Sequence, residues 1–119
     1  MIRTLLVDDS ARFLDLFVSL LEREPDMEVV ARAGSLAEAR GNLSGVDVAI
    51  IDHGLPDGAG LELISELHEA SPAAAVLVIS ATVEHAHPRE ALEAGAAEVV
   101  DKVAPPEEII SAIRRVAGG

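Results

Sequence analysis

The sequence predicts an α/β fold in which five parallel strands form one doubly wound sheet with helices on both faces. Two observations lead to this prediction. Five short apolar runs, most of them rich in β-branched residues, alternate along the chain with segments whose apolar residues recur at helical spacing. The connections from each helix to the next strand are short, so the strands must run parallel and be joined by right-handed crossovers.

The first half of the chain contains three of these strand–helix units. Strands are expected over residues 2–7, 27–33 and 46–51, and helices over residues 10–23, 36–43 and 60–69. Phe13 and Phe17 are the only aromatic residues of the chain. They lie four residues apart on the apolar side of the first helix, so we expect both to pack in the core. Leu16 is assigned to the same apolar side.

The second half completes the pattern with two further units. Strands are expected over 74–79 and 98–101, with helices over 88–94 and from 105–108 onward, where prolines and acidic residues mark a helix start. The helix over 88–94 has Leu92 as its one large apolar anchor. Five such units favour the flavodoxin-like strand order 2-1-3-4-5, which places the first and third strands side by side.

The composition limits the classes of function. The chain has 119 residues, which suits one domain, and it has no cysteine, which excludes disulfides and thiolate metal sites. A formal net charge of −12 argues against direct binding to nucleic acid and suits binding of a cation. The apolar runs are too short to span a bilayer, and Asp8-Asp9 interrupts the first of them, so no signal peptide is expected. We therefore expect a cytoplasmic protein without a membrane segment.

Polar residues stand at the carboxyl ends of four of the five predicted strands, where open parallel sheets bind their ligands. Asp8 and Asp9 follow the first strand, Asp52 the third, Ser80 the fourth, and Lys102, the only lysine, the fifth. Three carboxylates in one crevice repel one another, and a divalent cation removes that repulsion. Because all the ligands offered are oxygen atoms, Mg²⁺ is the expected ion.

Each of these residues also has an ordinary structural interpretation. Asp52 alone fits a turn cap, Asp8-Asp9 a helix N-cap, Ser80 a strand end, and Lys102 a solvated surface residue. Together they match the needs of phosphoryl transfer, which are a carboxylate nucleophile, positive charge on both sides of the phosphoryl group and a hydroxyl donor. The glycines of the loop, Gly58 and Gly60, are interpreted as turn residues.

Five segments in order along the chain resemble the receiver domains of two-component response regulators, which have the CheY-like fold. These are LLVDDS (5–10), IDHGLPDGAGLEL (51–63), VISA (78–81), EAGAAEVVDK (93–102) and APPEEI (104–109). The late stretch DKVAPPEEI and the ending AIRRVAGG are similar to the receiver half of the NarL/FixJ (LuxR-type) subfamily. The resemblance covers essentially the whole chain, so residues 1–119 are expected to form one receiver domain.

The resemblance implies a role for each residue of the constellation. Asp52 is the phosphoacceptor for a sensor histidine kinase, and Mg²⁺ is the cofactor. The implied metal ligands are Asp8, Asp9, Asp52 and the backbone carbonyl of His53. Ser80 is the switch hydroxyl, and Lys102 pairs with the phosphoryl group. The domain is then no enzyme beyond catalysing its own phosphorylation and dephosphorylation.

The resemblance also implies how the signal leaves the domain. Phosphorylation would draw Ser80 inward and shift the region around 82–92, which alters a partner surface. Receivers of this subfamily are the regulatory half of DNA-binding transcriptional regulators, and some form homodimers. DNA would be bound only through an output domain that this chain does not contain.

Three positions depart from the family pattern. Val103 follows Lys102 where many receivers have proline, so we expect a trans peptide bond there. Val99 replaces the aromatic residue whose rotation accompanies switching in many receivers. His53 is unusual after the acceptor; its side chain either bonds near the phosphoryl group or faces solvent, and we favour solvent.

These departures keep an alternative open, which is a pseudo-receiver that binds proteins without being phosphorylated. A Mg²⁺-dependent phosphatase of the haloacid dehalogenase type is disfavoured, because Gly54 stands where such enzymes have a second aspartate as general acid. A flavodoxin-like FMN protein is disfavoured because carboxylates follow the first strand, where its phosphate loop belongs.

Overall fold

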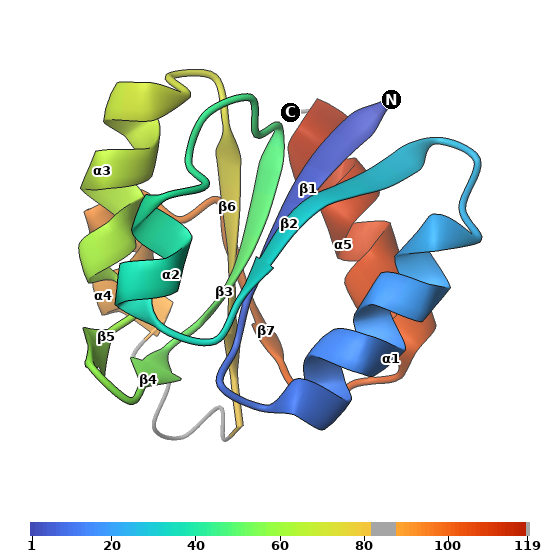
Figure 1. Ribbon diagram of the computed structural model, residues 1–119, viewed down its shortest axis with the longest axis horizontal. Coiled ribbons are helices and arrows are strands. Elements are labelled where there is room, and N and C mark those ends of the chain that lie inside the picture. Colours follow the sequence, from blue (N-terminus) through green and yellow to red (C-terminus); the bar gives the residue numbers. More distant parts are fainter. Residues whose placement is uncertain (82–87, 119) are drawn as a thin grey trace.

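The computed structural model describes residues 1–81 and 88–118 as a single parallel sheet between two layers of helices (Figure 1). The sheet has the order β2-β1-β3-β6-β7, so the predicted order 2-1-3-4-5 is confirmed. Its strands are β1 (Ile2–Val7), β2 (Met27–Ala33), β3 (Val48–Asp52), β6 (Ala75–Ser80) and β7 (Glu98–Asp101). All four pairings between them are parallel.

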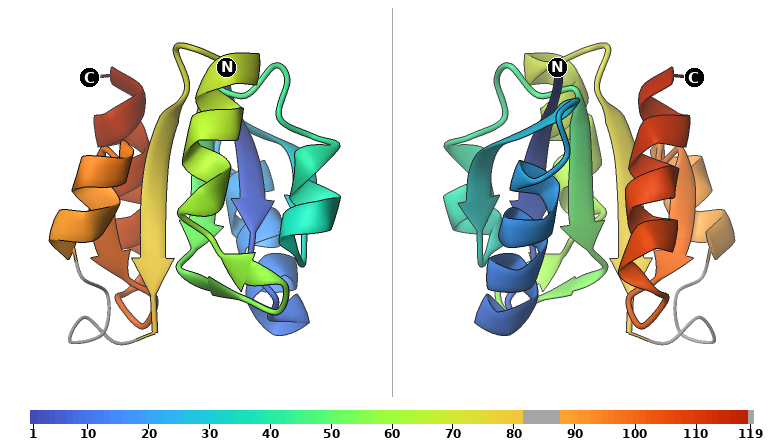
Figure 2. Two further views of the ribbon diagram at one scale, coloured as in Figure 1. Left: turned by 90° about the vertical axis from the view of Figure 1, so that its left-hand side faces the viewer. Right: turned by 90° about the vertical axis from the view of Figure 1, so that its right-hand side faces the viewer.

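The helices divide between the two faces of the sheet, as the doubly wound topology requires. They are α1 (Ala11–Glu22), α2 (Leu36–Arg40), α3 (Glu62–Ala70), α4 (Pro88–Ala94) and α5 (Pro106–Gly118). Helices α1 and α5 cover one face, while α2, α3 and α4 cover the other (Figures 1 and 2). None of the described helices is long and apolar enough to cross a membrane.

Two apolar clusters, one on each face of the sheet, form the core. On the α1/α5 side Phe17, Ile50 and Ile109 are buried, and on the α2/α3 side Ile51, Leu63 and Leu67 are buried. All five residues of β3 are buried, because this central strand is covered on both faces. The central strand therefore carries its last residue, Asp52, to the sheet edge from a rigid position.

Several local expectations need correction. The helix expected over 36–43 ends at Arg40, and the helix expected from residue 60 begins at Glu62. The loop before it contains a two-stranded antiparallel hairpin of β4 (Gly54–Leu55) and β5 (Gly58–Ala59), which is too short to leave a sequence pattern. Leu16 is 50% exposed and so does not lie on the buried side of α1, and Leu92 is 51% exposed and is not the anchor of α4. The residue of α4 that is buried is the small Ala91.

Candidate functional site

The predicted site residues meet at the carboxyl edge of the sheet because the strands that carry them are in register. Val7 pairs with Ile51, so Asp8 and Asp52 continue neighbouring strands at the same level. Asp52 in turn pairs with Ile79, so Ser80 lies one residue farther along β6. The arrowheads of these strands end at one edge of the molecule in Figure 2.

Three carboxylates gather at this edge. Asp8, Asp9 and Asp52 each offer one carboxylate oxygen, and these atoms all lie within 4.8 Å of one another. Asp8 is fully buried and Asp52 is 8% exposed, whereas Asp9 is exposed. Two buried carboxylates and one open to solvent thus form a pocket that a cation can reach from outside.

The electrostatics of the pocket favour a cation. Burial and, after it, the neighbouring Asp8 carboxylate raise the pKa of Asp52 to about 6, although the Lys102 ammonium acts in the opposite direction. Carboxylates that must share a buried site with one another are stabilised by a divalent ion. An all-oxygen donor set fits Mg²⁺, so the residues present suit the ion that the sequence predicts.

Lys102 reaches back from the end of β7 into this acidic pocket. Its Nζ lies 2.9 Å from Oδ1 and 2.7 Å from Oδ2 of Asp8, and 3.8 Å from Oδ2 of Asp52. The Lys102 backbone N–H donates to the Ser80 carbonyl at 2.8 Å, which fixes the point from which the side chain starts. The Lys102 side chain is only 19% exposed, so it is not the solvated surface lysine of the structural interpretation.

The helix that follows β1 is capped by Ser10, not by Asp8 or Asp9. The Ser10 hydroxyl oxygen accepts from the Phe13 N–H at 3.2 Å, and the Ser10 N–H donates to Asp8 Oδ1 at 2.8 Å. Asp8 therefore has a structural hydrogen bond in addition to its contact with Lys102. The second carboxylate, Asp9, remains on the exposed side of the pocket.

His53 bridges the two central strands and the loop beyond them. Its N–H donates to the Ile79 carbonyl at 3.0 Å, and its carbonyl accepts from the Gly60 N–H at 2.8 Å. The imidazole Nε2 is buried and has no hydrogen-bond partner in the part of the chain that the structure describes. The interpretation that this side chain faces solvent is therefore wrong for Nε2.

Sequence reasoning missed three residues that shape the site. A Cβ on Gly60 would lie 2.0 Å from the Asp52 carbonyl oxygen, so Gly60 is required by close approach and not only by a turn. Asp57 accepts from the N–H groups of Leu36 and Ala37, which ties the acceptor loop to α2. The Phe13 ring lies beneath the Lys102 ammonium. Of these three features, the sequence indicated only the turn around Gly60, through its cluster of turn-forming residues.

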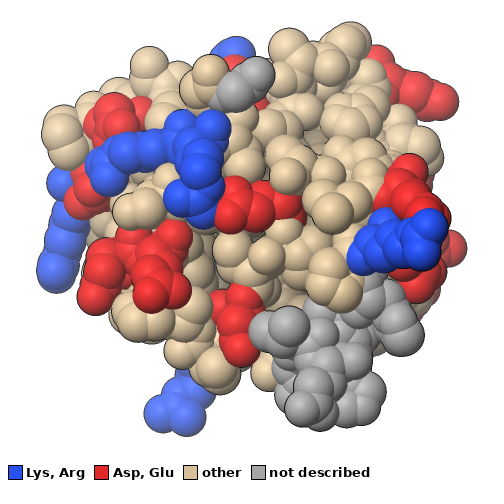
Figure 3. All heavy atoms as spheres, turned by 180° about the vertical axis from the view of Figure 1, so that it is seen from behind, with Lys and Arg blue, Asp and Glu red and all other residues tan. Residues whose placement is uncertain are grey.

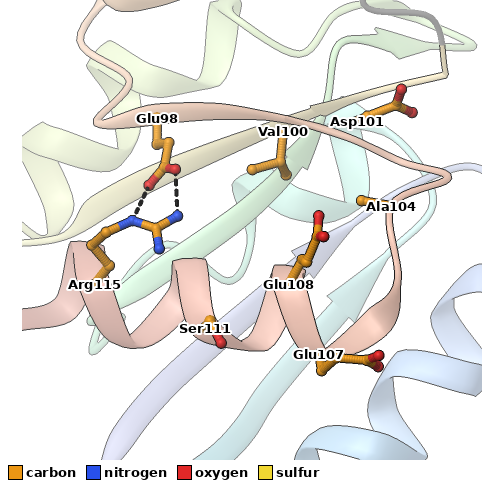
Figure 4. Close-up of a pocket in the computed structure, with 8 residues that line it drawn as sticks. All are labelled: Glu98, Val100, Asp101, Ala104, Glu107, Glu108, Ser111 and Arg115. Atoms are coloured by element: carbon orange, nitrogen blue, oxygen red, sulfur yellow. Dashed lines mark hydrogen bonds and ion pairs between the residues drawn. The ribbon is translucent and has the colours of Figure 1, made fainter.

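A cavity of about 480 Å³ lies away from the acidic pocket, between β7 and α5. Val100 and Ala104 form its apolar part, and Glu107 and Glu108 of α5 lie at its rim. Glu98 and Arg115 point toward one another across it and form a two-pronged ion pair (Figure 4). This cavity contains none of the predicted site residues.

The basic side chains of the surface are largely neutralised. Most arginines form ion pairs with carboxylates, and on the face shown in Figure 3 the blue side chains lie mostly beside red ones. The paired arginines are Arg3, Arg32, Arg40, Arg89, Arg114 and Arg115. Carboxylates therefore flank most of the arginine charges of this surface.

Comparison with known proteins agrees with the geometry. The response regulator receiver domain family matches residues 4–114. The transcriptional regulatory protein UhpA of Salmonella typhimurium is 40% identical over the whole chain, which spans 60% of that protein. A two-component response regulator of the LuxR family from Aurantimonas sp. superimposes with a TM-score of 0.87 at 31% identity, over 98% of this chain and 85% of that one.

A further solved structure contains the ligands that the acidic pocket suggests. It is a response regulator from Burkholderia pseudomallei with a phosphorylated aspartic acid, a calcium ion and citrate. It superimposes with a TM-score of 0.83 at 26% identity, over 98% of this chain and 68% of that one. This chain, with Asp52 beside Asp8 and Asp9, is thus similar to a response regulator whose structure contains a phosphorylated aspartate and a divalent cation.

Proposed function

This chain belongs to the response regulator receiver domains, and we propose that residues 1–119 act as a switch that is phosphorylated on Asp52 by a sensor histidine kinase. The observation that carries the proposal is the acidic pocket. Asp52 is buried at the end of the central strand, within 4.8 Å of the carboxylate oxygens of Asp8 and Asp9. Lys102 supplies positive charge from the far side, 3.8 Å from Asp52.

Mg²⁺ would be held by Asp8, Asp9, Asp52 and the carbonyl of His53, and it would supply charge neutralisation to the phosphoryl oxygens. The His53 carbonyl already accepts one hydrogen bond from Gly60, so its second lone pair would serve the ion. Support for the ion comes from the donor set, which is oxygen throughout, and from the raised pKa of Asp52.

The proposed reaction transfers a phosphoryl group from a histidine nitrogen of the kinase to a carboxylate oxygen of Asp52. One carboxylate oxygen of Asp52 forms a bond to phosphorus as the phosphorus–nitrogen bond to the kinase histidine breaks, and the leaving imidazole takes a proton. Lys102 would pair with a phosphoryl oxygen, and the Ser80 hydroxyl would donate to another. With a pKa of about 6, Asp52 is mostly ionised at neutral pH and available as the nucleophile. The chain then catalyses only its own phosphorylation and dephosphorylation.

The proposed output of the switch is control of transcription. The chain spans 60% of the length of UhpA, so a DNA-binding output domain, and through it control of transcription, is part of the proposal. The proposal also includes a homodimer and a cytoplasmic location beside the kinase. Phosphorylation would act on the region around residues 82–92, of which 82–87 lie outside the described residues.

The alternative is a pseudo-receiver that binds a partner without phosphate. It draws on Val99, which replaces the expected aromatic residue on β7. The peptide bond between Lys102 and Val103 is trans, as expected. The paired set of Asp8, Asp52 and Lys102 favours the phosphorylated switch over this alternative.

Intact mass after incubation with Mg²⁺ and acetyl phosphate tests the proposal. The expected result is one added phosphoryl group, lost in the Asp52→Asn variant and in the presence of EDTA. Full labelling of Asp52→Asn would overturn the assignment of the acceptor. No adduct on the folded wild-type chain, even with a histidine kinase as donor, would favour the pseudo-receiver.

A further inference from the structure

We propose that Phe13 is a positioning residue that holds the Lys102 ammonium within reach of Asp52 during phosphoryl transfer. The Lys102 Nζ lies over the Phe13 ring, 4.9 Å from the ring centroid. This is within the range in which the negative face of an aromatic ring attracts a cation. The inference rests on the proposed function, because it assigns Phe13 a role in the same transfer.

The ring is held in place from two sides. The backbone N–H of Phe13 donates to the Ser10 hydroxyl at the start of α1. The N–H of Ser10 in turn donates to Asp8. The ring itself is stacked on Phe17, with centroids 4.5 Å apart and an angle of 28° between the planes. Phe17 is 3% exposed and belongs to the core. Phe13 therefore presents a fixed surface to Lys102.

The need for such a surface follows from the contacts of Lys102. Its ammonium is paired with both oxygens of Asp8, at 2.7 and 2.9 Å, and is farther from Asp52 at 3.8 Å. A divalent cation held by Asp8 would compete with the ammonium for the same oxygens. An aromatic ring is no ligand for Mg²⁺, so the attraction of Phe13 for the ammonium persists when Asp8 is occupied. Phe13 thus retains Lys102 in the pocket after its carboxylate partner is withdrawn.

If Phe13 served core packing alone, an aliphatic side chain could replace it. Phe13 is partly buried and packs against the α1/α5 cluster, and an aliphatic side chain of similar size satisfies that requirement. An aliphatic side chain can also lie along the stem of Lys102, but it has no quadrupole to attract the ammonium. Core packing and attraction of the ammonium can therefore be told apart by a ring that keeps its shape but loses its electron density.

The contact itself is tested without metal or phosphate. Protons that lie over an aromatic ring are shifted upfield in the NMR spectrum, so the Hε protons of Lys102 in the metal-free protein should be upfield of ordinary lysine values. That shift should persist in Phe13→Tyr and vanish in Phe13→Leu. Lys102 Hε resonances that are the same in wild type and Phe13→Leu would overturn the contact.

The role in transfer is tested with fluorinated phenylalanines placed at residue 13, which keep the shape of the ring and progressively remove its negative face. The rate of Asp52 phosphorylation by acetyl phosphate at saturating Mg²⁺ should fall stepwise with fluorination, by about fivefold in the most fluorinated ring. Phe13→Tyr keeps an electron-rich ring, so this variant should be phosphorylated at the wild-type rate. The melting temperature of each variant reports on packing and should not follow the same series.

Phe17 is the matched control, because the chain has two phenylalanines and they stack on each other. The same fluorinated residues at 17 keep the shape of the ring that supports Phe13 and leave the electron density of the Phe13 ring in place, so the phosphorylation rate should fall much less than with the same residues at 13. An equal loss from both positions, or no loss from position 13, would overturn the proposal. Failure of the wild-type chain to accept phosphate would instead overturn the proposed function and, with it, the role in transfer. The NMR shift would then still report on the contact.

Discussion

The Lys102 ammonium lies 2.7 Å from Asp8 Oδ2 but 3.8 Å from Asp52 Oδ2, so the lysine is paired with a carboxylate other than the proposed acceptor. Asp8 is fully buried, and it also accepts a hydrogen bond from the Ser10 N–H. The same carboxylate is a proposed metal ligand. A divalent cation bound at this site would therefore compete with Lys102 for Asp8.

Lys102→Met should raise the affinity for Mg²⁺ while it lowers the rate of phosphorylation. Removal of the ammonium frees Asp8 for the ion but also removes the positive charge near Asp52. In EDTA the variant should be less stable by about 3 kcal/mol, because a buried carboxylate loses its partner. Mg²⁺ should restore most of that loss, as measured by chemical unfolding. Lys102→Arg, which keeps the charge, is the control, and an unchanged Mg²⁺ affinity in Lys102→Met would contradict the competition.

The raised pKa of Asp52 predicts how stability depends on pH. The pKa is 3.8 as a reference for the unfolded chain and about 6 in the folded protein, so the folded state binds the proton more tightly. The stability contribution of this group is therefore fully present below pH 3.8 and is lost as the pH rises through 6. In EDTA the free energy of unfolding should fall by up to about 3 kcal/mol over this window.

Asp52→Asn isolates this effect from other titrating groups. The difference in unfolding free energy between the variant and wild type should grow in favour of the variant from pH 4 to pH 7, since asparagine carries no charge to bury. Mg²⁺ should reduce the difference at pH 7 by stabilising the ionised wild-type pocket. A difference that does not change with pH would mean that Asp52 titrates normally.

Gly60→Ala should damage both stability and phosphorylation. The added Cβ would lie 2.0 Å from the Asp52 carbonyl oxygen and 2.8 Å from Ile51 Cγ2, so the end of β3 has to move. We expect a loss of at least about 2 kcal/mol in unfolding free energy and a slower transfer to the displaced Asp52. Gly54→Ala is the matched control, because a Cβ there meets nothing within 4 Å. Equal effects of the two substitutions would argue against the close approach.

Asp57→Ala should loosen the start of α2. The carboxylate accepts from the Leu36 N–H at 2.8 Å and the Ala37 N–H at 3.1 Å, and these bonds hold the pKa of Asp57 below its usual range. Amide hydrogen exchange at these two positions should become faster in the variant. The Glu38 amide, which donates to the Ser35 hydroxyl instead, should change less. Ser35→Ala should show the reverse pattern, and uniform acceleration in either variant would indicate global loosening.

The sequence by itself determined the fold and the residues of the acidic pocket. Periodicity separated strands from helices, and short connections required parallel strands, so the order of the sheet followed. That order places Asp8 and Asp52 on adjacent strands, because polar residues that end neighbouring parallel strands share one edge. These features depend on interactions that are local or are imposed by topology, which is why a linear pattern records them.

Only the tertiary structure decided how the side chains of the pocket pair. Lys102 and Asp8 are 94 residues apart, and their 2.9 Å hydrogen bond leaves no trace in either local sequence. The position of Phe13 beneath Lys102 is likewise a contact between distant segments, whereas the burial of His53 Nε2 and the closeness of Gly60 to Asp52 depend on how the loop after β3 folds back on that strand. Periodicity reports which face of an element is apolar, whereas the partner of a single polar atom depends on three-dimensional packing within a few ångströms.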